Sequence, residues 1–241
     1  MRLKTIFVVL FVPIVMLTNA FAEEKKWKDQ AELSFVNTGG NTDVTSLSAK
    51  NELKYQFSKK LLASWKLQTL FGESDGVKNA ENYFTELRAD YSFSGKLFLS
   101  VNANWLKDKF SGVDPRVTVG PSVGYHFLAG PKHSLVGEAG LLYVNEEHTD
   151  NTQVDYLGGR LFAKYEYAFS EKNKFSQSVE ALNDFDNSDN TNLISETALV
   201  TALTDVLSQK ASYVIKYDNE PIPATLDRTD TILSLTLIVN F

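Results

Sequence analysis

One short motif in this sequence has the letters of a catalytic serine. The segment 120–124, Gly-Pro-Ser-Val-Gly, matches a nucleophile elbow, in which the serine needs a strand-to-helix turn and a later acid and histidine. His126, His133 and His148 follow Ser122 in the chain. The motif lies inside an alternating apolar–polar run, however, and no helical pattern follows it. The sequence therefore favours a strand with small residues, and an outer-membrane lipid hydrolase stays as the alternative function.

A second motif suggests metal chemistry. The segment 184–189, Asp-Phe-Asp-Asn-Ser-Asp, has the spaced carboxylates of a calcium loop. An EF-hand loop also needs Gly at its sixth position and Glu at its twelfth, and this segment has neither. We therefore expect a solvated acidic loop, with no metal site and no cofactor.

Charged residues at alternating positions form the third candidate site. Seven basic and seven acidic side chains lie on the polar faces of the predicted strands. They are Lys50, Glu52, Lys54, Lys66, Glu86, Arg88, Asp90, Glu138, Arg160, Lys164, Glu166, Glu180, Glu196 and Lys216. A Lys or Arg facing lipid at mid-membrane costs roughly 2–4 kcal/mol, so these groups must face inward if the strands cross a membrane. A balanced set can close the interior by ion pairs or line a narrow aqueous path with little ion selectivity. The candidates for lining such a lumen are Lys54, Lys66, Glu86, Arg88, Arg160 and Glu166.

The elements that carry these residues are strands. Apolar and polar residues alternate from Gln30 to Phe241, which is the period of a half-buried strand. The alternation predicts twelve strands, at 30–37, 44–57, 61–72, 81–93, 97–107, 116–127, 134–145, 154–169, 174–183, 191–203, 208–218 and 229–241. The segment 134–145 fits least well, because Val136, Leu142 and Val144 interrupt its polar face.

Aromatic residues repeat at every second strand end. Four times an aromatic residue, any residue and Phe precede a tight turn, and side chains two apart lie on the same side of a strand. These residues are Tyr55, Phe57, Tyr91, Phe93, Tyr125, Phe127, Tyr167 and Phe169, and the chain ends on Phe241. Rings at one level around a sheet are typical of a girdle at a membrane–water interface. A second girdle is expected from Phe35, Phe71, Tyr83, Trp105, Tyr143 and Tyr217.

The predicted connections alternate in length. Those that follow the aromatic repeats are short, and longer ones are expected at 38–43, 73–80, 108–115, 146–153, 184–190 and 219–228. Short turns on one side and long loops on the other are typical of outer-membrane barrels. The sequence thus predicts an all-β fold, a 12-stranded antiparallel up-and-down transmembrane β-barrel, with both chain ends and the first girdle on the periplasmic side. A soluble β-sandwich would explain the alternation but not the girdle.

The first 22 residues are predicted to be separate from the barrel. Arg2 and Lys4 precede an apolar run, and Ala20-Phe21-Ala22 supplies small residues for cleavage, as in a secretory signal peptide. We therefore assign 1–22 to a cleaved signal and 23–241 to the barrel. The formal net charge is −6 and there is no cysteine. An acidic chain without a basic cluster argues against nucleic-acid binding.

Two segments carry a family resemblance. Residues 33–42, Leu-Ser-Phe-Val-Asn-Thr-Gly-Gly-Asn-Thr, resemble the opening signature of the YdiY-like family of salt-induced outer membrane proteins of unknown function. Residues 217–221, Tyr-Asp-Asn-Glu-Pro, and a final strand ending in Phe are also similar, and the resemblance extends from Trp27 to Phe241. It implies a place in the outer membrane of a Gram-negative bacterium, and that the assembly machinery of that membrane recognises Phe241. It implies no substrate and no catalytic residue.

The function expected from these observations is passive rather than enzymatic. The chain is predicted to be a small channel, or a structural barrel that supports the envelope under osmotic or salt stress, the stress role coming only from the resemblance. Its expected partners are outer-membrane lipids and lipopolysaccharide, because the predicted outer loops are acidic and can bridge to it through divalent ions.

Overall fold

A computed structural model describes residues 26–40, 44–74 and 77–241. All twelve predicted strands are present in it, with ends that shift by a few residues. They are β1 (Trp27–Gly39), β2 (Val44–Gln56), β3 (Leu61–Ser74), β4 (Val77–Ser92), β5 (Leu97–Asp108), β6 (Val113–Ala129), β7 (His133–His148), β8 (Gln153–Ala168), β9 (Asn173–Asp184), β10 (Thr191–Ala202), β11 (Leu207–Asp218) and β12 (Thr229–Asn240). The predicted signal peptide lies outside the described residues.

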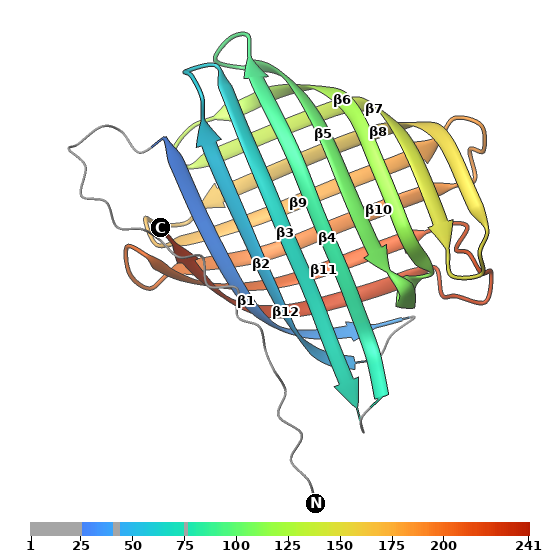
Figure 1. Cartoon of the computed structure of the whole chain (residues 1–241). Helices are drawn as coiled ribbons and strands as arrows, with labels where there is room; N and C mark the ends of the chain where they lie inside the picture. Colours follow the sequence, from blue (N-terminus) through green and yellow to red (C-terminus); the bar gives the residue numbers. More distant parts are fainter. Residues whose placement is uncertain (1–25, 41–43, 75–76) are drawn as a thin grey trace, which may run out of the picture.

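The strands form one closed barrel. Each strand pairs antiparallel with its neighbours in the chain, and β12 pairs with β1 from Gln30↔Asn240 to Gly39↔Thr231. Figure 1 shows the steep tilt of the strands, with β1 to β5 in front and the later strands crossing behind them. Closure leaves no sheet edge unpaired, which is what allows strands to cross a membrane. The predicted fold class is confirmed.

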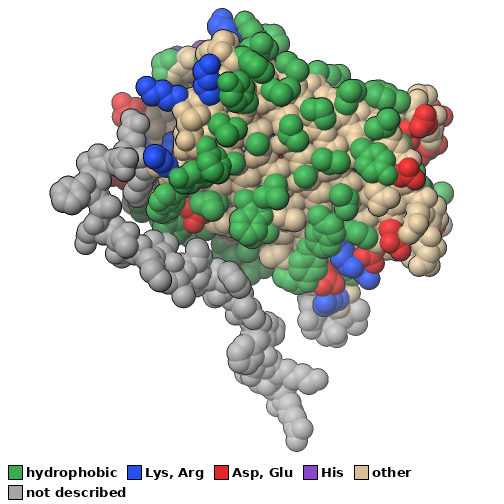
Figure 2. All heavy atoms as spheres, turned by 45° about the horizontal axis from the view of Figure 1, so that its top comes forward, with side chains coloured by type: hydrophobic (Ala, Val, Ile, Leu, Met, Phe, Trp, Pro, Cys, Tyr) green, Lys and Arg blue, Asp and Glu red, His purple; other side chains and the backbone are tan. Residues whose placement is uncertain are grey.

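The barrel wall is apolar outside and polar inside. Leu161 and Leu235 are 63% and 62% exposed on the outer surface, while Ser100 and Ser122 are 1% and 3% exposed in the interior. Figure 2 shows apolar side chains spread across the visible wall, with charged side chains mainly toward its edges. In a water-soluble domain the apolar side chains are buried and the polar ones are exposed. The opposite distribution here is the one expected for a barrel that is surrounded by lipid. Within the described residues, no helix is long and apolar enough to span a membrane.

The aromatic repeats all lie at one end of the barrel, which we call the turn end. It contains the connections 57–60, 93–96, 130–132, 169–172 and 203–206. The rings of Tyr55 and Phe57 meet edge to face at 4.7 Å, and the other three pairs are similar, with centroids 4.8 to 5.1 Å apart. Lys132 lies 5.5 Å from the ring of Tyr167. These contacts place rings and ammonium groups together at one level, and their role as an interface girdle stays a prediction.

The predicted rhythm of loop lengths is wrong at four of the six connections at the opposite end, which we call the loop end: 40–43, 75–76, 109–112 and 149–152 are no longer than the connections of the turn end. Strands β3 and β4 continue pairing until only 75–76 separate them, and the expected loop at 146–153 shrinks to 149–152. The pairing continues because backbone hydrogen bonds do not require apolar side chains, so strands outlast their alternating pattern. Only 185–190 and 219–228 are longer than the connections of the turn end.

Candidate functional site: the barrel lumen

A bidentate ion pair joins two strands that are not neighbours. Arg88 on β4 donates to Glu138 on β7 through both terminal nitrogens, at 2.8 and 3.1 Å. Arg160 on β8 donates to the same carboxylate at 2.9 Å and to Glu180 on β9. Strands β5 and β6 lie between β4 and β7, so the Arg88–Glu138 contact spans two strands on the inner face of the barrel. Bidentate arginine–carboxylate pairs are strong and directional, so the cluster fixes the curvature here.

A second cluster holds the strands around the point of closure. Glu32 on β1 accepts hydrogen bonds from Lys50 on β2 at 3.0 Å and from Lys210 on β11 at 2.9 Å. The side chain of Glu32 is only 5% exposed, and Lys210 also lies 3.9 Å from Glu196. One buried carboxylate thus satisfies two ammonium groups on opposite sides of it.

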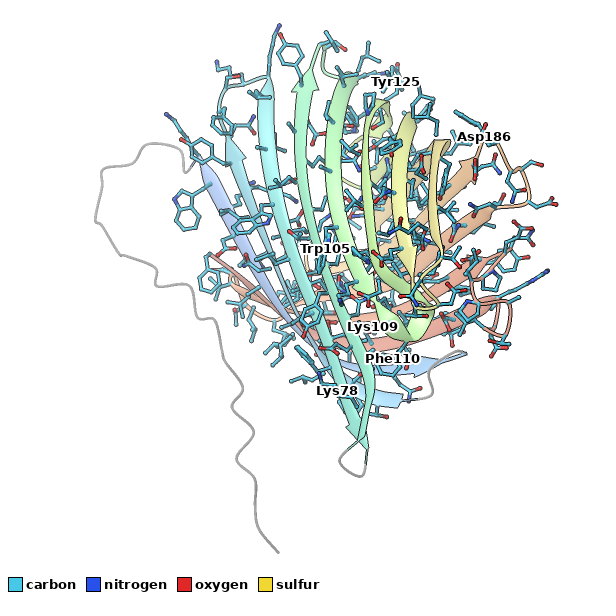
Figure 3. All side chains as sticks on the ribbon, turned by 45° about the vertical axis from the view of Figure 1, so that its right-hand side comes forward. Lys78, Trp105, Lys109, Phe110, Tyr125 and Asp186 are labelled. Atoms are coloured by element: carbon cyan, nitrogen blue, oxygen red, sulfur yellow. The ribbon has the colours of Figure 1, made fainter. Side chains whose placement is uncertain are left out.

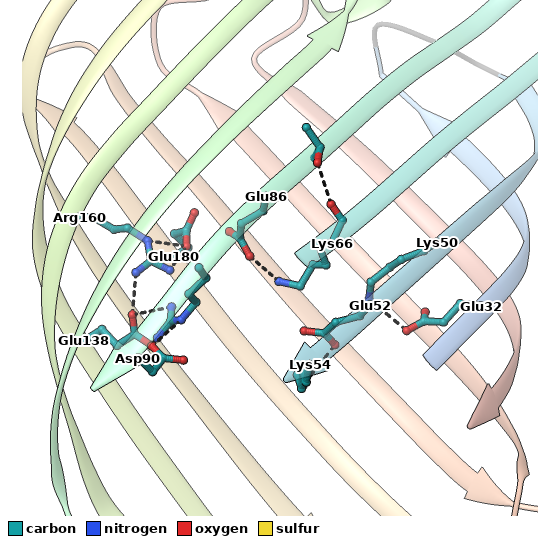
Figure 4. A network of polar contacts seen from close by, with 12 residues as sticks. Glu32, Lys50, Glu52, Lys54, Lys66, Glu86, Asp90, Glu138, Arg160 and Glu180 are labelled. Carbon is teal, nitrogen blue, oxygen red and sulfur yellow. Dashed lines mark hydrogen bonds and ion pairs between the residues drawn. The ribbon is translucent and has the colours of Figure 1, made fainter. Parts of the chain in front are cut away.

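The remaining predicted lumen residues also form ion pairs. Lys66 pairs with Glu86 at 2.7 Å, and Lys54 pairs with Glu52 at 3.3 Å. Glu166 accepts from two lysines, Lys164 at 3.2 Å and Lys174 at 3.1 Å. Figure 4 shows Glu138, Arg160 and Glu180 of the first cluster, Glu32 and Lys50 of the second, and the Lys66–Glu86 pair on the inner face of the barrel. We call the two clusters and the Lys66–Glu86 pair the ion-pair belt.

A cavity of about 280 Å³ opens between the belt and the loop end. Strands β1 to β4 and β10 to β12 supply most of its walls, and Glu32, Lys50 and Lys210 line its deep end. Its residues are both polar and apolar, as in pockets that accept small molecules.

The other side of the lumen is filled. Leu142, Val144 and Tyr156 form a buried cluster, with Val154 and Leu182 packed against it. These include two of the residues that interrupted the polar pattern of 134–145, so the irregularity marks packing inside the barrel. Beside them, Arg116 and Glu146 form a bidentate pair at 2.6 and 2.7 Å. The open cavity of the lumen lies on the side near β1 and β12.

The two short motifs lie in a strand and in a loop, respectively. Ser122 lies in the middle of β6, where its hydroxyl contacts Ser100 Oγ at 2.6 Å and Glu138 Oε2 at 3.3 Å. No histidine is among its partners in the described chain, and the strand simply continues after it. In the acidic loop, the carboxylate of Asp184 accepts from the backbone N–H of Asp186 at 2.8 Å, so it caps its own turn. No group of three metal-ligating residues occurs within the described ranges.

The loop end also carries charges outside the strands. Lys109 lies in a short 3-10 helix, η1 (Lys109–Ser111), that the sequence did not predict. Its ammonium group donates to Asp114 at 2.7 Å, and this hydrogen bond raises the pKa of Lys109. Figure 3 shows Lys109 beside Phe110 at the loop end, below β5.

Among the lumen residues that the sequence analysis missed are Glu32 and Lys210, the centre of the second cluster. Both occupy positions in phase with the predicted inward charges, since Glu32 is the register partner of Lys50 and Lys210 lies six residues before Lys216. Strand phase alone could have found them. The contact between their side chains could not be predicted from the sequence, because it depends on how far β1 and β11 curve toward each other.

Solved structures share this architecture. The NanC porin aligns with a TM-score of 0.62 and 7% identity, covering 87% of this chain and 98% of the porin. An outer membrane channel from Pseudomonas putida F1 aligns with a TM-score of 0.58 and 9% identity, over 89% of this chain and 95% of that chain. The translocator domain of the autotransporter NalP from Neisseria meningitidis gives 0.55 at 12% identity, over 91% and 90%. At these identities the likeness concerns the fold alone.

Sequence comparison places the chain in a family. The protein named "Uncharacterized protein YdiY" from Escherichia coli (strain K12) is 24% identical over 214 residues, which is 89% of this chain and 83% of that protein. A family model described as "Protein of unknown function, DUF481" matches residues 31–241, nearly the whole barrel. The predicted YdiY-like resemblance is confirmed, and the chain belongs to the DUF481 family.

Proposed function

We propose that this chain is a small passive channel of the bacterial outer membrane. The turn end, with its aromatic residues, faces the periplasm, and the loop end faces outward. Small polar solutes enter the cavity from the loop end, and the ion-pair belt is the narrowest part of their path.

One observation carries this proposal: the barrel keeps an open cavity instead of filling its interior. The cavity of about 280 Å³ leads from the loop end to the Glu32–Lys50–Lys210 cluster. A barrel needed only for support gains stability by packing that space with side chains, since voids lose dispersion contacts. The two lysines contact Glu32 through long, partly exposed side chains, at 25% and 17% exposure, which can move without unfolding a strand.

The test measures solute uptake into liposomes that contain the purified, folded chain. Swelling in a pentose solution should be faster than in protein-free liposomes. Replacing Glu32 and Lys210 together by Ser removes the two long side chains that close the deep end of the cavity. The solute path should widen, and the swelling rate should rise severalfold.

A matched control replaces another ion pair by the same residues. Lys164→Ser with Glu166→Ser removes a pair that does not line the cavity, and its swelling rate should equal that of the unchanged chain. No solute passage through either the unchanged chain or the Glu32/Lys210 double variant would refute the channel.

A closed supporting barrel is the second candidate. The buried Leu142–Val144–Tyr156 cluster favours it, because it fills the interior beside β7 and β8. A supporting barrel predicts that deleting the protein weakens the envelope under osmotic or salt stress while solute uptake stays normal. Liposome swelling at the protein-free rate would favour this candidate over the channel.

The proposed partners are outer-membrane lipids and lipopolysaccharide around the apolar wall, and the outer-membrane assembly machinery at Phe241. Phe241 is 45% exposed and follows β12 at the point where the barrel closes. Its backbone N–H donates to Asp29 O of β1 at 2.9 Å. Phe241→Ala should keep the closed fold and reduce the amount of barrel assembled in cells.

A further inference from the structure

Hydroxyl groups form a continuous patch on the inner wall of the barrel. Ser34 on β1 lies between its register partners Ser48 on β2 and Thr236 on β12. Two residues closer to the loop end, Ser234 on β12 lies opposite Ser212 on β11. All five residues line the open cavity, and we call them the hydroxyl patch. The patch thus spans four neighbouring strands around the point where β12 pairs with β1.

The hydroxyls of the patch differ in whether the protein supplies a partner. Ser34 Oγ and Thr236 Oγ1 lie 2.8 Å apart and form a hydrogen bond. The side chains of Ser212 and Ser234 form no hydrogen bond with other described residues, although the two residues are only 6% and 9% exposed. A buried hydroxyl without a protein partner needs one from elsewhere. For these two serines the cavity is the place from which a partner can come.

Apolar side chains alternate with the hydroxyls on the same wall. Val36 is the register partner of Ser234, and Val214 follows Ser212 by two residues on the inner face of β11. Both valines line the cavity. A compound with several hydroxyls on a carbon skeleton matches this mixture, because its C–H groups can pack against the valines. Its hydroxyls can donate to or accept from the serines, since a hydroxyl does both.

The charged groups around the cavity do not favour an anionic ligand. At the deep end, Glu32 is already paired with two lysines. Near the loop end, the lining residues include three carboxylates and one ammonium group, which belong to Glu81, Asp108, Asp230 and Lys216. This excess of negative charge opposes the entry of an anion. An uncharged ligand avoids that cost and can still form hydrogen bonds with the patch.

The size of the cavity limits the ligand. Its volume of about 280 Å³ lies just below the range of roughly 300–1,000 Å³ that is typical of pockets for drug-sized molecules. We infer that the hydroxyl patch is a binding site for small uncharged polyhydroxyl compounds, of the size of a pentitol or a monosaccharide. Ser212 and Ser234 are its main hydrogen-bonding residues. The inference rests on the proposed channel for the path to the site, and it names the solute class of that channel.

The experiment measures binding without passage, by saturation-transfer NMR on the folded chain in amine-oxide detergent micelles. Three probes share a five-carbon chain: xylitol, pentane-1,5-diol, which lacks the three inner hydroxyls, and xylonate, which has a carboxylate at one end. Xylitol should bind saturably in roughly the millimolar range. The diol should bind about tenfold more weakly or less, because it lacks hydrogen-bonding groups for the serines, and so should xylonate, because of its charge.

Variants then locate the site. Ser212→Ala with Ser234→Ala removes two hydroxyls and hardly changes the cavity volume, so xylitol binding should weaken about tenfold. The control is Ser176→Ala with Ser178→Ala on β9. These serines are the register partners of Glu166 and Lys164 and do not line the cavity, so their loss should leave xylitol binding unchanged.

The outcomes separate the binding site from the channel. Absence of saturable xylitol binding, equal binding of the three probes, or unchanged binding after the Ser212/Ser234 change overturns the inference. Liposome swelling in xylitol tests the channel separately. Swelling without saturable binding leaves the channel in place and removes the site, whereas binding without swelling supports the site and refutes the channel.

Discussion

At the residue scale, Glu138 has the most connected carboxylate of the ion-pair belt. It accepts hydrogen bonds from Arg88 and Arg160 and is 5% exposed. Glu138→Gln removes the carboxylate that both guanidinium groups share and leaves Arg88 with Asp90 and Arg160 with Glu180 alone. Breaking a buried pair by removing one partner costs up to about 3–5 kcal/mol. We expect a matching loss in the free energy of unfolding, measured by urea titration of the barrel in liposomes.

The control for this prediction is Glu52→Gln. Glu52 pairs with Lys54, whose side chain is 43% exposed, so the loss should stay below about 1 kcal/mol. Similar losses at the two positions would show that Glu138 has no special role in the belt.

Individual residues also show where sequence reasoning ends. The six predicted lumen candidates, Lys54 and Arg88 among them, follow from strand phase alone, because charges are costly in lipid. The sequence could not predict which of these charged side chains pair with one another. Arg88 and Glu138 are fifty residues apart in the chain and two strands lie between them in the barrel, so their contact depends on curvature.

At the scale of elements, strands β6 and β7 approach closely at glycines. A Cβ on Gly120 would overlap the carbonyl of Leu141. Gly120→Val should therefore push β6 away from β7 and destabilise the barrel by about 1–3 kcal/mol, as overpacking does. Gly95, in the β4–β5 turn, has no atom within 4 Å of the position that a Cβ would take, so Gly95→Val should change stability by less than about 0.5 kcal/mol. Urea unfolding of both variants checks this, and equal effects would contradict it.

The strands themselves were predictable because alternation records which side of each strand meets lipid. Their ends were not, as β3 and β4 show by pairing almost to 75–76. Beyond the apolar band both faces of a strand meet water, so the sequence has no alternation there although the backbone continues to pair. The helix η1 was also missed, since three residues carry no periodic signal.

At the scale of the whole molecule, the two surfaces of the wall follow opposite rules. Outside, the exposed side chains are mostly apolar, as contact with lipid requires. Inside, the ion-pair belt, the open cavity and the buried Leu142–Val144–Tyr156 cluster occupy different parts of the lumen. Because of this contrast, the fold could be predicted from the alternation of apolar and polar residues. The contacts within the lumen could not, because they depend on how the closed barrel brings distant strands together.

The outer wall gives a direct test of the membrane environment. Leu235 is 62% exposed near the middle of β12, so Leu235→Lys would place an ammonium group in lipid at a cost of roughly 2–4 kcal/mol. We expect the variant to insert poorly into liposomes, measured as the fraction that keeps a folded, heat-modifiable gel mobility. Asp205→Lys, in the exposed turn between β10 and β11, introduces the same group outside the wall and should insert normally. Normal insertion of both variants would mean that lipid does not surround this part of the barrel.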